Sequence, residues 1–271
     1  MDNLSHYVIR SGTEGAKRMR LIAPLIATDT NALLDRVGLN NGLECLDIGC
    51  GNGAVSLELA RRVGPDGHVT GGDIDDIKLT MARTEAHLQG IENVTFKHMD
   101  VRNMHENCCY DVIYARFLLT HLPSPSQALN VLYQHLSPGG SIILEDIDFK
   151  GNTSYPDCPA LERYQALYCT CVKQRGGDPF IGIKLPSLLR QNHFTNIRMA
   201  AVQNLGMEGD IKLISAITME NIADSLLNDG LASTSEIDEI ITELYAFANN
   251  PDTIAGMPRV IQAWGYRPIN E

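Results

Sequence analysis

Short apolar segments alternate with segments of helical periodicity throughout residues 43–149, and this alternation limits the available folds more than any other feature. An apolar run of about 4–8 residues fits a buried strand, whereas apolar residues three or four apart fit a helix packed on one side. Strands that alternate with helices predict a parallel sheet covered on both faces. We expect strands at residues 44–48, 68–73, 94–97, 110–114 and 141–145, and helices at 54–63, 78–89 and 125–136.

The rest of the chain is less regular. It predicts a helix at 185–191, a strand at 196–202, helices across 211–249 with a break at 228–230, and a last strand at 259–266. No internal repeat or Ser/Gly-rich linker divides it. We therefore expect one compact domain, with residues 1–42 as an N-terminal helical arm, 43–150 as a ligand-binding core, and 151–271 as the remaining sheet with helical insertions.

The composition of the chain limits which binding partners and which cellular compartment are expected. The net charge of −11 over 271 residues repels a phosphate backbone on average, so nucleic acid is not an expected partner. No apolar run approaches the roughly 18 residues of a membrane span, and the first residues lack a signal-peptide pattern. The seven cysteines are irregularly spaced, which indicates reduced thiols and predicts a cytoplasmic protein.

The segment 47–53, Asp-Ile-Gly-Cys-Gly-Asn-Gly, stands between the first strand and the first helix of the core. Glycines there let the backbone turn sharply and approach a ligand at the carboxyl end of the sheet. The segment fits two fingerprints. Gly49-x-Gly51-x-x-Ala54 matches the dinucleotide pattern, and Asp47-x-Gly49-x-Gly51-x-Gly53 matches the pattern of S-adenosyl-L-methionine (SAM) sites.

Three acidic residues favour SAM over a dinucleotide. Asp47, two residues before the first glycine, suits an ammonium group and opposes a pyrophosphate. Asp73 ends the second strand, where a carboxylate receives a ribose hydroxyl pair with either ligand. Asp100 follows the third strand, where it can accept a hydrogen bond from an adenine amino group. A helix cap would explain any one of these acids, but not all three at strand ends.

On these residues the chain resembles the class I SAM-dependent methyltransferases, in particular the small-molecule type related to the quinone-biosynthesis methyltransferases. The matching motifs are 46–53, Gly72-Asp73-Ile74-Asp75, Met99-Asp100-Val101, 110–113 and 136–140. The resemblance implies a Rossmann-like, mainly parallel sheet of seven strands whose last strand is antiparallel, with helices on both faces. Residues 260–266 suit that last strand.

The resemblance also implies where the cofactor contacts the chain. Its methionine part lies over the loop, at Asp47, Gly49, Cys50, Gly51 and Gly53. Its adenosine part lies at the next two strand ends: Asp73 binds the ribose, Ile74 packs on the adenine, and Asp100 and Val101 meet the adenine edge.

Methyl transfer from a sulfonium is an in-line displacement, so the protein's main contribution is alignment. Three catalytic candidates stand near the ends of the fourth and fifth strands. Arg116 would contact the cofactor carboxylate or an anionic acceptor, and His121 is either a general base or a residue bonded only to backbone. Glu145, or Asp146 beside it, either points into the acceptor pocket or lies in a solvated loop. No further metal ligands accompany them, so we expect no metal.

The N-terminal arm is a candidate lid. Tyr7 and a pair of Glu14 with Arg18, four residues apart, resemble the opening of some small-molecule methyltransferases, in which such a helix covers the cofactor. A solvated amphipathic helix is the alternative. We expect the arm and the helices of 211–249 to roof a pocket for a small-molecule acceptor, floored by the three catalytic candidates.

Two other functions stand beside the methyltransferase: a non-catalytic SAM-binding partner protein and an NAD-dependent oxidoreductase. The residues leave open which of O, N, C or S is methylated, because the acceptor-specific elements lie in the insertions. They also leave the oligomeric state open, a homodimer included.

Overall fold

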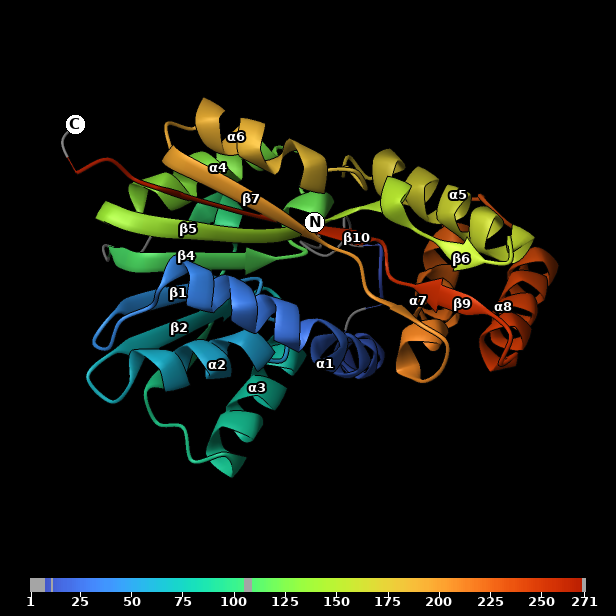
Figure 1. Ribbon diagram of the computed structural model, residues 1–271, viewed down its shortest axis with the longest axis horizontal. Coiled ribbons are helices and arrows are strands. Elements are labelled where there is room, and N and C mark those ends of the chain that lie inside the picture. The colour runs from blue at the N-terminus through green and yellow to red at the C-terminus, as the bar shows by residue number, and fades with distance from the viewer. Residues whose placement is uncertain (1–7, 11, 105–108, 270–271) are drawn as a thin grey trace.

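The computed structural model describes residues 8–10, 12–104 and 109–269; of Thr13, Glu14 and Ala16 it describes the backbone only. Its centre is a seven-stranded sheet of order β3-β2-β1-β4-β5-β10-β7 (Figure 1). The strands are β1 (Glu44–Ile48), β2 (His68–Asp73), β3 (Val94–His98), β4 (Tyr110–Arg116), β5 (Leu136–Asp148), β7 (Thr195–Val202) and β10 (Arg259–Tyr266).

The first five strands are parallel, and β10 runs antiparallel to both of its neighbours, β5 and β7. The predicted seven-stranded sheet with an antiparallel last strand is thereby confirmed. The strand order reverses between β1 and β4, and open α/β sheets bind ligands outside the carboxyl ends of the strands at such a point.

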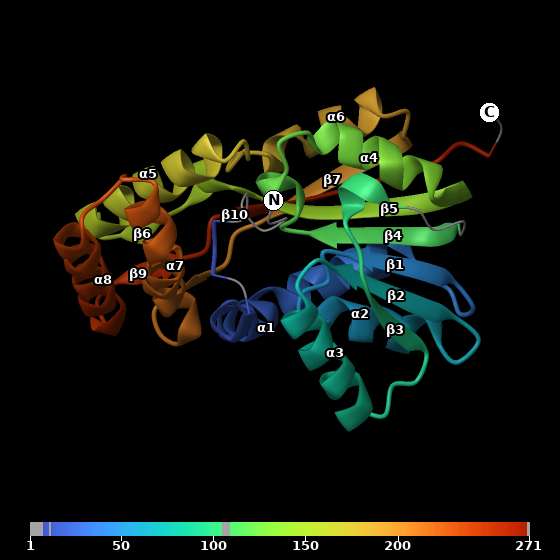
Figure 2. The same ribbon diagram turned by 180° about the vertical axis from the view of Figure 1, so that it is seen from behind.

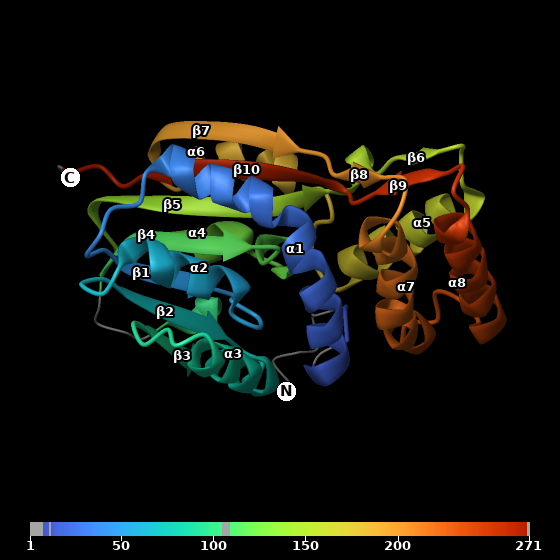
Figure 3. The same cartoon turned by 60° about the horizontal axis from the view of Figure 1, so that its bottom comes forward.

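Helices cover both faces of the sheet. α1 (Gly12–Val37) and α2 (Ala54–Val63) pack on one face, and α4 (Pro125–Gln134) and α6 (Leu185–Gln191) on the other (Figure 3). α3 (Asp76–Leu88) packs against α2 near β3, at one edge of the sheet. Leu33 and Leu34 of α1 are fully buried in the core of the first face, so the N-terminal arm is in part a core helix.

A second cluster of elements lies beyond the carboxyl ends of the strands (Figures 1 and 2). It contains α5 (Pro159–Gln174), α7 (Asp210–Asn228) and α8 (Thr234–Asn249). Three short strands, β6 (Ser154–Tyr155), β9 (Ile254–Gly256) and β8 (Leu205–Gly206), form a separate sheet in that order. We call these six elements the cap. Its three helices share a core of their own, to which Val8 and Ile9 contribute.

The sequence predicts the parallel core closely and the cap in part. The helix at 185–191 and the break between α7 and α8 are found as expected, whereas α5 and the small sheet were not predicted. β5 is longer than the expected 141–145, because β10 pairs with it continuously from Ser141 to Asp148. Within the described ranges, no helix is long and apolar enough to cross a bilayer.

Candidate active site

The glycine loop that follows β1 is closed by its own hydrogen bonds. The N–H groups of Gly49 and Cys50 both donate to the carbonyl oxygen of Gly72, at 2.7 and 3.0 Å. Gly51 N donates to Asp73 Oδ2 at 2.8 Å, and Gly53 N donates to Cys50 O at 3.0 Å. Four donors of the loop are thus engaged within the chain, so the loop offers a close-packed surface rather than a row of free N–H groups.

Gly53 shows why the loop requires glycine. Its φ is +82°, and a Cβ at this position would lie 2.9 Å from both Ala82 Cβ and Phe96 Cζ. A left-handed backbone and a contact closer than van der Waals distance both exclude a side chain. Gly53 therefore packs the start of α2 against α3 and β3.

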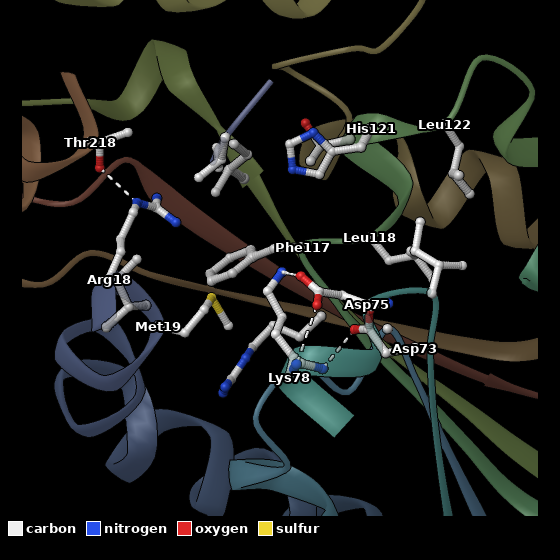
Figure 4. A pocket seen from close by; sticks show the side chains of 18 of the residues that line it. Arg18, Met19, Asp73, Asp75, Lys78, Phe117, Leu118, His121, Leu122 and Thr218 are labelled. Atoms are coloured by element: carbon white, nitrogen blue, oxygen red, sulfur yellow. Dashed lines mark hydrogen bonds and ion pairs between the residues drawn. The ribbon is translucent and has the colours of Figure 1, made fainter. Parts of the chain in front are cut away.

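A large cavity opens at the carboxyl edge of the sheet, between the sheet and the cap (Figure 4). The space between its walls is about 1410 Å³, including the opening to solvent. One half is lined by the strand ends: Ile48, Gly49, Gly51, Asp73, Ile74, Asp75, Met99, Asp100, Val101 and Leu118. The other half is lined by α1, the end of β5 and the cap: Arg18, Met19, Ile147, Phe149, Tyr164, Tyr168, Ile214, Thr218 and Met257. We call these the sheet half and the cap half.

Asp73 stands at the wall of the sheet half. Its carboxylate accepts from Gly51 N and, at 2.9 Å, from Asp75 N, and the residue is 9% exposed. A carboxylate accepts about four hydrogen bonds, so two backbone donors leave capacity for a ligand. Asp75 caps α3 and accepts from Gly12 N at 2.9 Å, while Lys78 Nζ lies 3.6 Å from its carboxylate.

Asp100 and Val101 form the far end of the sheet half. Asp100 caps a short 3-10 turn by accepting from Arg102 N at 3.0 Å, and Arg102 Nη2 pairs with it at 2.6 Å. The bonds from Arg102 hold the pKa of Asp100 below its usual value. The structure thus brings Asp73, Ile74, Asp100 and Val101 to one wall, as the sequence predicts.

Arg116 and His121 also line the cavity, near the junction of its halves. Arg116 Nη1 donates to Thr30 Oγ1 of α1 at 3.2 Å. His121 ends a 3-10 turn, Leu119–His121, that follows β4. Burial, together with the positive charges of Arg18 and Lys78, lowers the pKa of His121 to about 3. The ring is therefore neutral at physiological pH.

Glu145 is a correction to the sequence-based expectation. It lies inside β5 rather than in a loop, is 2% exposed and does not line the cavity. Its carboxylate accepts hydrogen bonds from Tyr114 Oη, from Thr30 Oγ1 at 2.7 Å and from Gln262 Nε2 at 2.7 Å. It therefore belongs to a buried network that joins α1, β4, β5 and β10.

Asp146 also points away from the cavity. It accepts from Thr120 N at 3.1 Å and from Ile147 N at 2.9 Å, and burial raises its pKa to about 7. These bonds hold the turn that carries His121. The expectation that Glu145 or Asp146 points into the acceptor pocket is wrong for both, because their carboxylates are satisfied within the sheet and the turn.

Some residues that were expected to contact the cofactor do not line the cavity. Asp47 accepts from Ser56 Oγ at 2.6 Å, is buried, and is not part of the cavity wall. Burial raises its pKa to about 6. Cys50 and Gly53 are likewise absent from the wall. Tyr7 lies outside the described residues, as does the side chain of Glu14, so their predicted roles stay predictions.

The cap half contains residues that the sequence did not single out for this place. Arg18 Nε donates to Thr218 Oγ1 of α7 at 3.0 Å, which ties the arm to the cap (Figure 4). Phe149 and Tyr168 stack with ring centroids 4.4 Å apart. Met19 and Ile214 complete this wall. Local pattern identifies α1 and α7 as amphipathic helices, but only the packing of the cap shows which residues face the cavity.

The strand order, the antiparallel β10 and a cavity over the glycine loop define the class I methyltransferase fold. The model of the family described as "Methyltransferase domain" matches residues 39–204, and the chain belongs to this family. The match covers the sheet up to the end of β7 and stops before α7.

Known proteins agree with this classification. The chain is 30% identical over 133 residues to a demethylmenaquinone methyltransferase of Staphylococcus aureus, which is 49% of this chain and 52% of that protein. The chain thus spans about half the length of the curated relatives it matches. Among solved structures, a putative methyltransferase of Bacillus halodurans has a TM-score of 0.62 at 17% identity, covering 89% of this chain and 99% of that one.

A second solved structure is a complex with two compounds. It is the phosphoethanolamine N-methyltransferase 2 of Haemonchus contortus, in complex with phosphomonomethylethanolamine and S-adenosylhomocysteine. Its TM-score is 0.59 at 16% identity, covering 94% of this chain and 58% of that one. At these identities, the two structures show a likeness of the fold alone.

Proposed function

We propose that this protein is a SAM-dependent methyltransferase that acts on a small molecule. The observation that carries the proposal is the two-sided cavity: its sheet half offers the glycine loop and two strand-end carboxylates, and its cap half is largely apolar. The two halves belong to one cavity, so a cofactor bound in the sheet half would have the cap half beside it for an acceptor.

The sheet half suits SAM residue by residue. The methionine part would lie over Gly49 and Gly51, where no side chain keeps it from the backbone, with its carboxylate toward Arg116. The ribose would bond to Asp73, and the adenine would lie along Ile74 with its edge at Asp100 and Val101. Bound SAM supplies a methyl group already activated by the sulfonium charge.

The chain's own contribution is alignment. Holding the acceptor atom in line with the methyl group is worth on the order of 7–11 kcal/mol when the geometry is good. The cap half lines the same cavity as the sheet half, and its largely apolar wall disfavours water around the reacting atoms. His121 lines the cavity with a neutral ring, but a pKa of about 3 makes that ring a weak base, so alignment is a larger contribution than proton removal.

The same geometry disfavours a nicotinamide dinucleotide. Dinucleotide loops bind a pyrophosphate through free backbone N–H groups, whereas four of the N–H groups here are bonded within the chain. Asp47 also places a buried carboxylate behind the loop, and this would disfavour a pyrophosphate. A non-catalytic SAM binder is disfavoured because the cap half stands open beside the sheet half.

Calorimetry with SAM, S-adenosylhomocysteine and NAD tests the cofactor. We expect the first two to bind with micromolar affinity and NAD not to bind. Incubation of cell-extract metabolites with methyl-labelled SAM then tests for transfer, and a labelled small molecule is the expected product. Binding of NAD in place of SAM would refute the proposal, whereas SAM binding with no labelled product would support the non-catalytic alternative.

The partners, the cellular compartment and the oligomeric state of the enzyme belong to the same proposal. The net charge of −11 argues against a nucleic-acid substrate. The six described cysteines are free thiols, which suits the cytoplasm. A homodimer stays one alternative for the oligomeric state.

A further inference from the structure

The charges on the cavity wall are unevenly distributed between its halves. Among the residues that the structure describes, the three wall carboxylates, Asp73, Asp75 and Asp100, stand in the sheet half. Two of the wall cations are paired there, Lys78 with Asp75 and Arg102 with Asp100. The remaining wall cations are Arg116 and Arg18.

Arg116 and Arg18 differ in their surroundings. Arg116 bonds to Thr30, whose hydroxyl donates to Glu145, and its charge stabilises the carboxylate of Asp47. Arg116 is therefore close to two buried acids. Arg18 has one bond, from Nε to the neutral hydroxyl of Thr218, and no described carboxylate lies within 4 Å of it.

Arg18 nevertheless stands in the apolar half of the cavity. It reaches this place from α1 and lies beside Thr218 of α7 (Figure 4), in the cavity that Tyr164 and Tyr168 of α5 also line. Its Nη groups are left for the cavity, because only Nε is committed. A half-buried cation on an apolar wall is costly unless a counter-charge accompanies it. Within the described residues, the chain supplies no counter-charge there.

The positive charge of Arg18 also affects the pKa values of neighbouring groups. Arg18 lowers the pKa of His121, and it opposes the burial that raises the pKa of Tyr164. A positive field at this wall stabilises an anion within its reach. Most of the rest of the cap half, with Phe149, Tyr168, Ile214 and Met257, offers apolar and aromatic surface to the body of a ligand.

We propose that the acceptor is a small organic acid with an apolar or aromatic body, and that its anionic group pairs with the guanidinium of Arg18. The inference rests on the proposed function and names the substrate class of the same site. Arg18 would hold two oxygens of a carboxylate, sulfonate or phosphate through its Nη groups, in the fork geometry that guanidinium groups favour. The aromatic wall would contact the rest of the acid.

The test compares acids with their neutral amides on the protein saturated with S-adenosylhomocysteine. The probes are benzoate, 4-hydroxybenzoate, cinnamate and indole-3-acetate, each with its primary amide, and binding is measured by calorimetry. Charge-assisted hydrogen bonds from a guanidinium favour at least one acid over its amide by about 10- to 100-fold. Saturation with the product form of the cofactor prevents turnover and occupies the sheet half.

Arg18→Gln should abolish the preference for the acid and change the affinity for S-adenosylhomocysteine less than about twofold. Arg18→Lys keeps the charge without the fork, so it should retain part of the preference. Arg20→Gln is the matched control, because Arg20 is an exposed arginine of the same helix that does not line the cavity. It should behave as the wild type.

Three results would overturn the inference. One is a panel in which no acid binds more tightly than its amide, as expected if Glu14 already neutralises Arg18. Another is an acid preference that persists in Arg18→Gln. The third is a large loss of S-adenosylhomocysteine affinity in Arg18→Gln, which would make Arg18 a cofactor residue. Failure of the wild type to bind S-adenosylhomocysteine would instead refute the proposed function, so the two failures are distinct.

Discussion

Asp73 has two tasks in this structure, and both follow from its place at the end of β2. It accepts from two backbone N–H groups, one in the glycine loop and one at the start of α3, and it faces the cavity. Its position was predictable from the sequence because a carboxylate after a short apolar run is a local pattern. Its bond to Gly51 was not predictable, because it depends on how β1 and β2 align.

We expect Asp73→Asn to weaken SAM binding by about 1–3 kcal/mol, because a charge-assisted pair of hydrogen bonds to the ribose is lost. Calorimetry measures the change. Asp66→Asn, in the exposed turn after α2, is the control and should leave the affinity unchanged. An Asp73→Asn variant that binds SAM as tightly as the wild type would remove Asp73 from the ribose site.

His121 predicts a pH dependence of stability. Its pKa is about 3 in the folded chain and about 6.5 in the unfolded chain, so between these values the unfolded state binds the extra proton. This residue therefore destabilises the fold as the pH falls through 6.5. Between pH 7.0 and 5.5 we expect the wild type to lose about 1 kcal/mol more unfolding free energy than His121→Gln. Urea titrations at the two pH values measure this difference, with exposed His87→Gln as control; equal losses in His121→Gln and wild type would contradict it.

At the scale of elements, the strand–helix alternation predicts the parallel core to within a few residues, because each element has its own periodicity. The same reasoning misses β6, β8 and β9, since strands of two or three residues have no pattern to detect. It also ends the fifth strand at Glu145 rather than at Asp148. The missing information is the pairing of β5 with β10, more than 110 residues later in the chain.

Gly53 of the glycine loop and Gly38, which follows α1, offer a matched pair of substitutions. Gly53 and Gly38 have φ values of +82° and +79°, so alanine suffers a similar backbone strain at both. Around Gly38 a Cβ would meet nothing within 4 Å, whereas at Gly53 it would meet Ala82 and Phe96 at 2.9 Å. We expect Gly53→Ala to cost about 1–3 kcal/mol more unfolding free energy than Gly38→Ala, by the overpacking of a filled core. Equal costs in urea unfolding would show that the loop relaxes.

Helix α1 serves the core with its C-terminal half and the cavity with its N-terminal half. Leu33 and Leu34 anchor it on the sheet, while Arg18, Met19 and Ile22 line the cavity. Deletion of residues 1–20 should therefore reduce methyl transfer by about 100-fold or more through misalignment of the ligands. The far-ultraviolet circular dichroism of the sheet and its helices should be largely kept. A truncated protein with full activity would show that the arm is not a lid.

At the scale of the whole molecule, function is divided between two cores that meet at one cavity. The sheet core carries the family pattern, and the family model matches it up to residue 204. About half of the cap core, including its α7 and α8 residues, lies outside that match, and the core supplies much of the apolar wall. This division explains why the sequence indicates the cofactor more readily than the acceptor: the cofactor contacts follow strand ends, whereas the acceptor contacts depend on how distant helices pack.

Catalysis should need no divalent cation. In the described part of the chain, no three His, Cys, Asp or Glu residues are grouped as metal ligands, and alignment with a neutral His121 accounts for the proposed reaction. We expect the rate of methyl transfer to stay within a factor of about two after treatment with a chelator. Loss of activity on chelation, with recovery on adding magnesium, would contradict this prediction.

The position of β10 between β5 and β7 also affects how the chain is made. β7 ends at Val202, but the strand that joins it to the sheet begins only at Arg259. Ribosomes add about 5–20 residues per second, so for several seconds the nascent chain exposes the unpaired edge of β5 and holds β7 without its neighbour. The long edge of β5 is then open to pairing with other chains. Until the final strand emerges, the chain avoids aggregation only if pairing with other chains is slow or if a chaperone covers this edge.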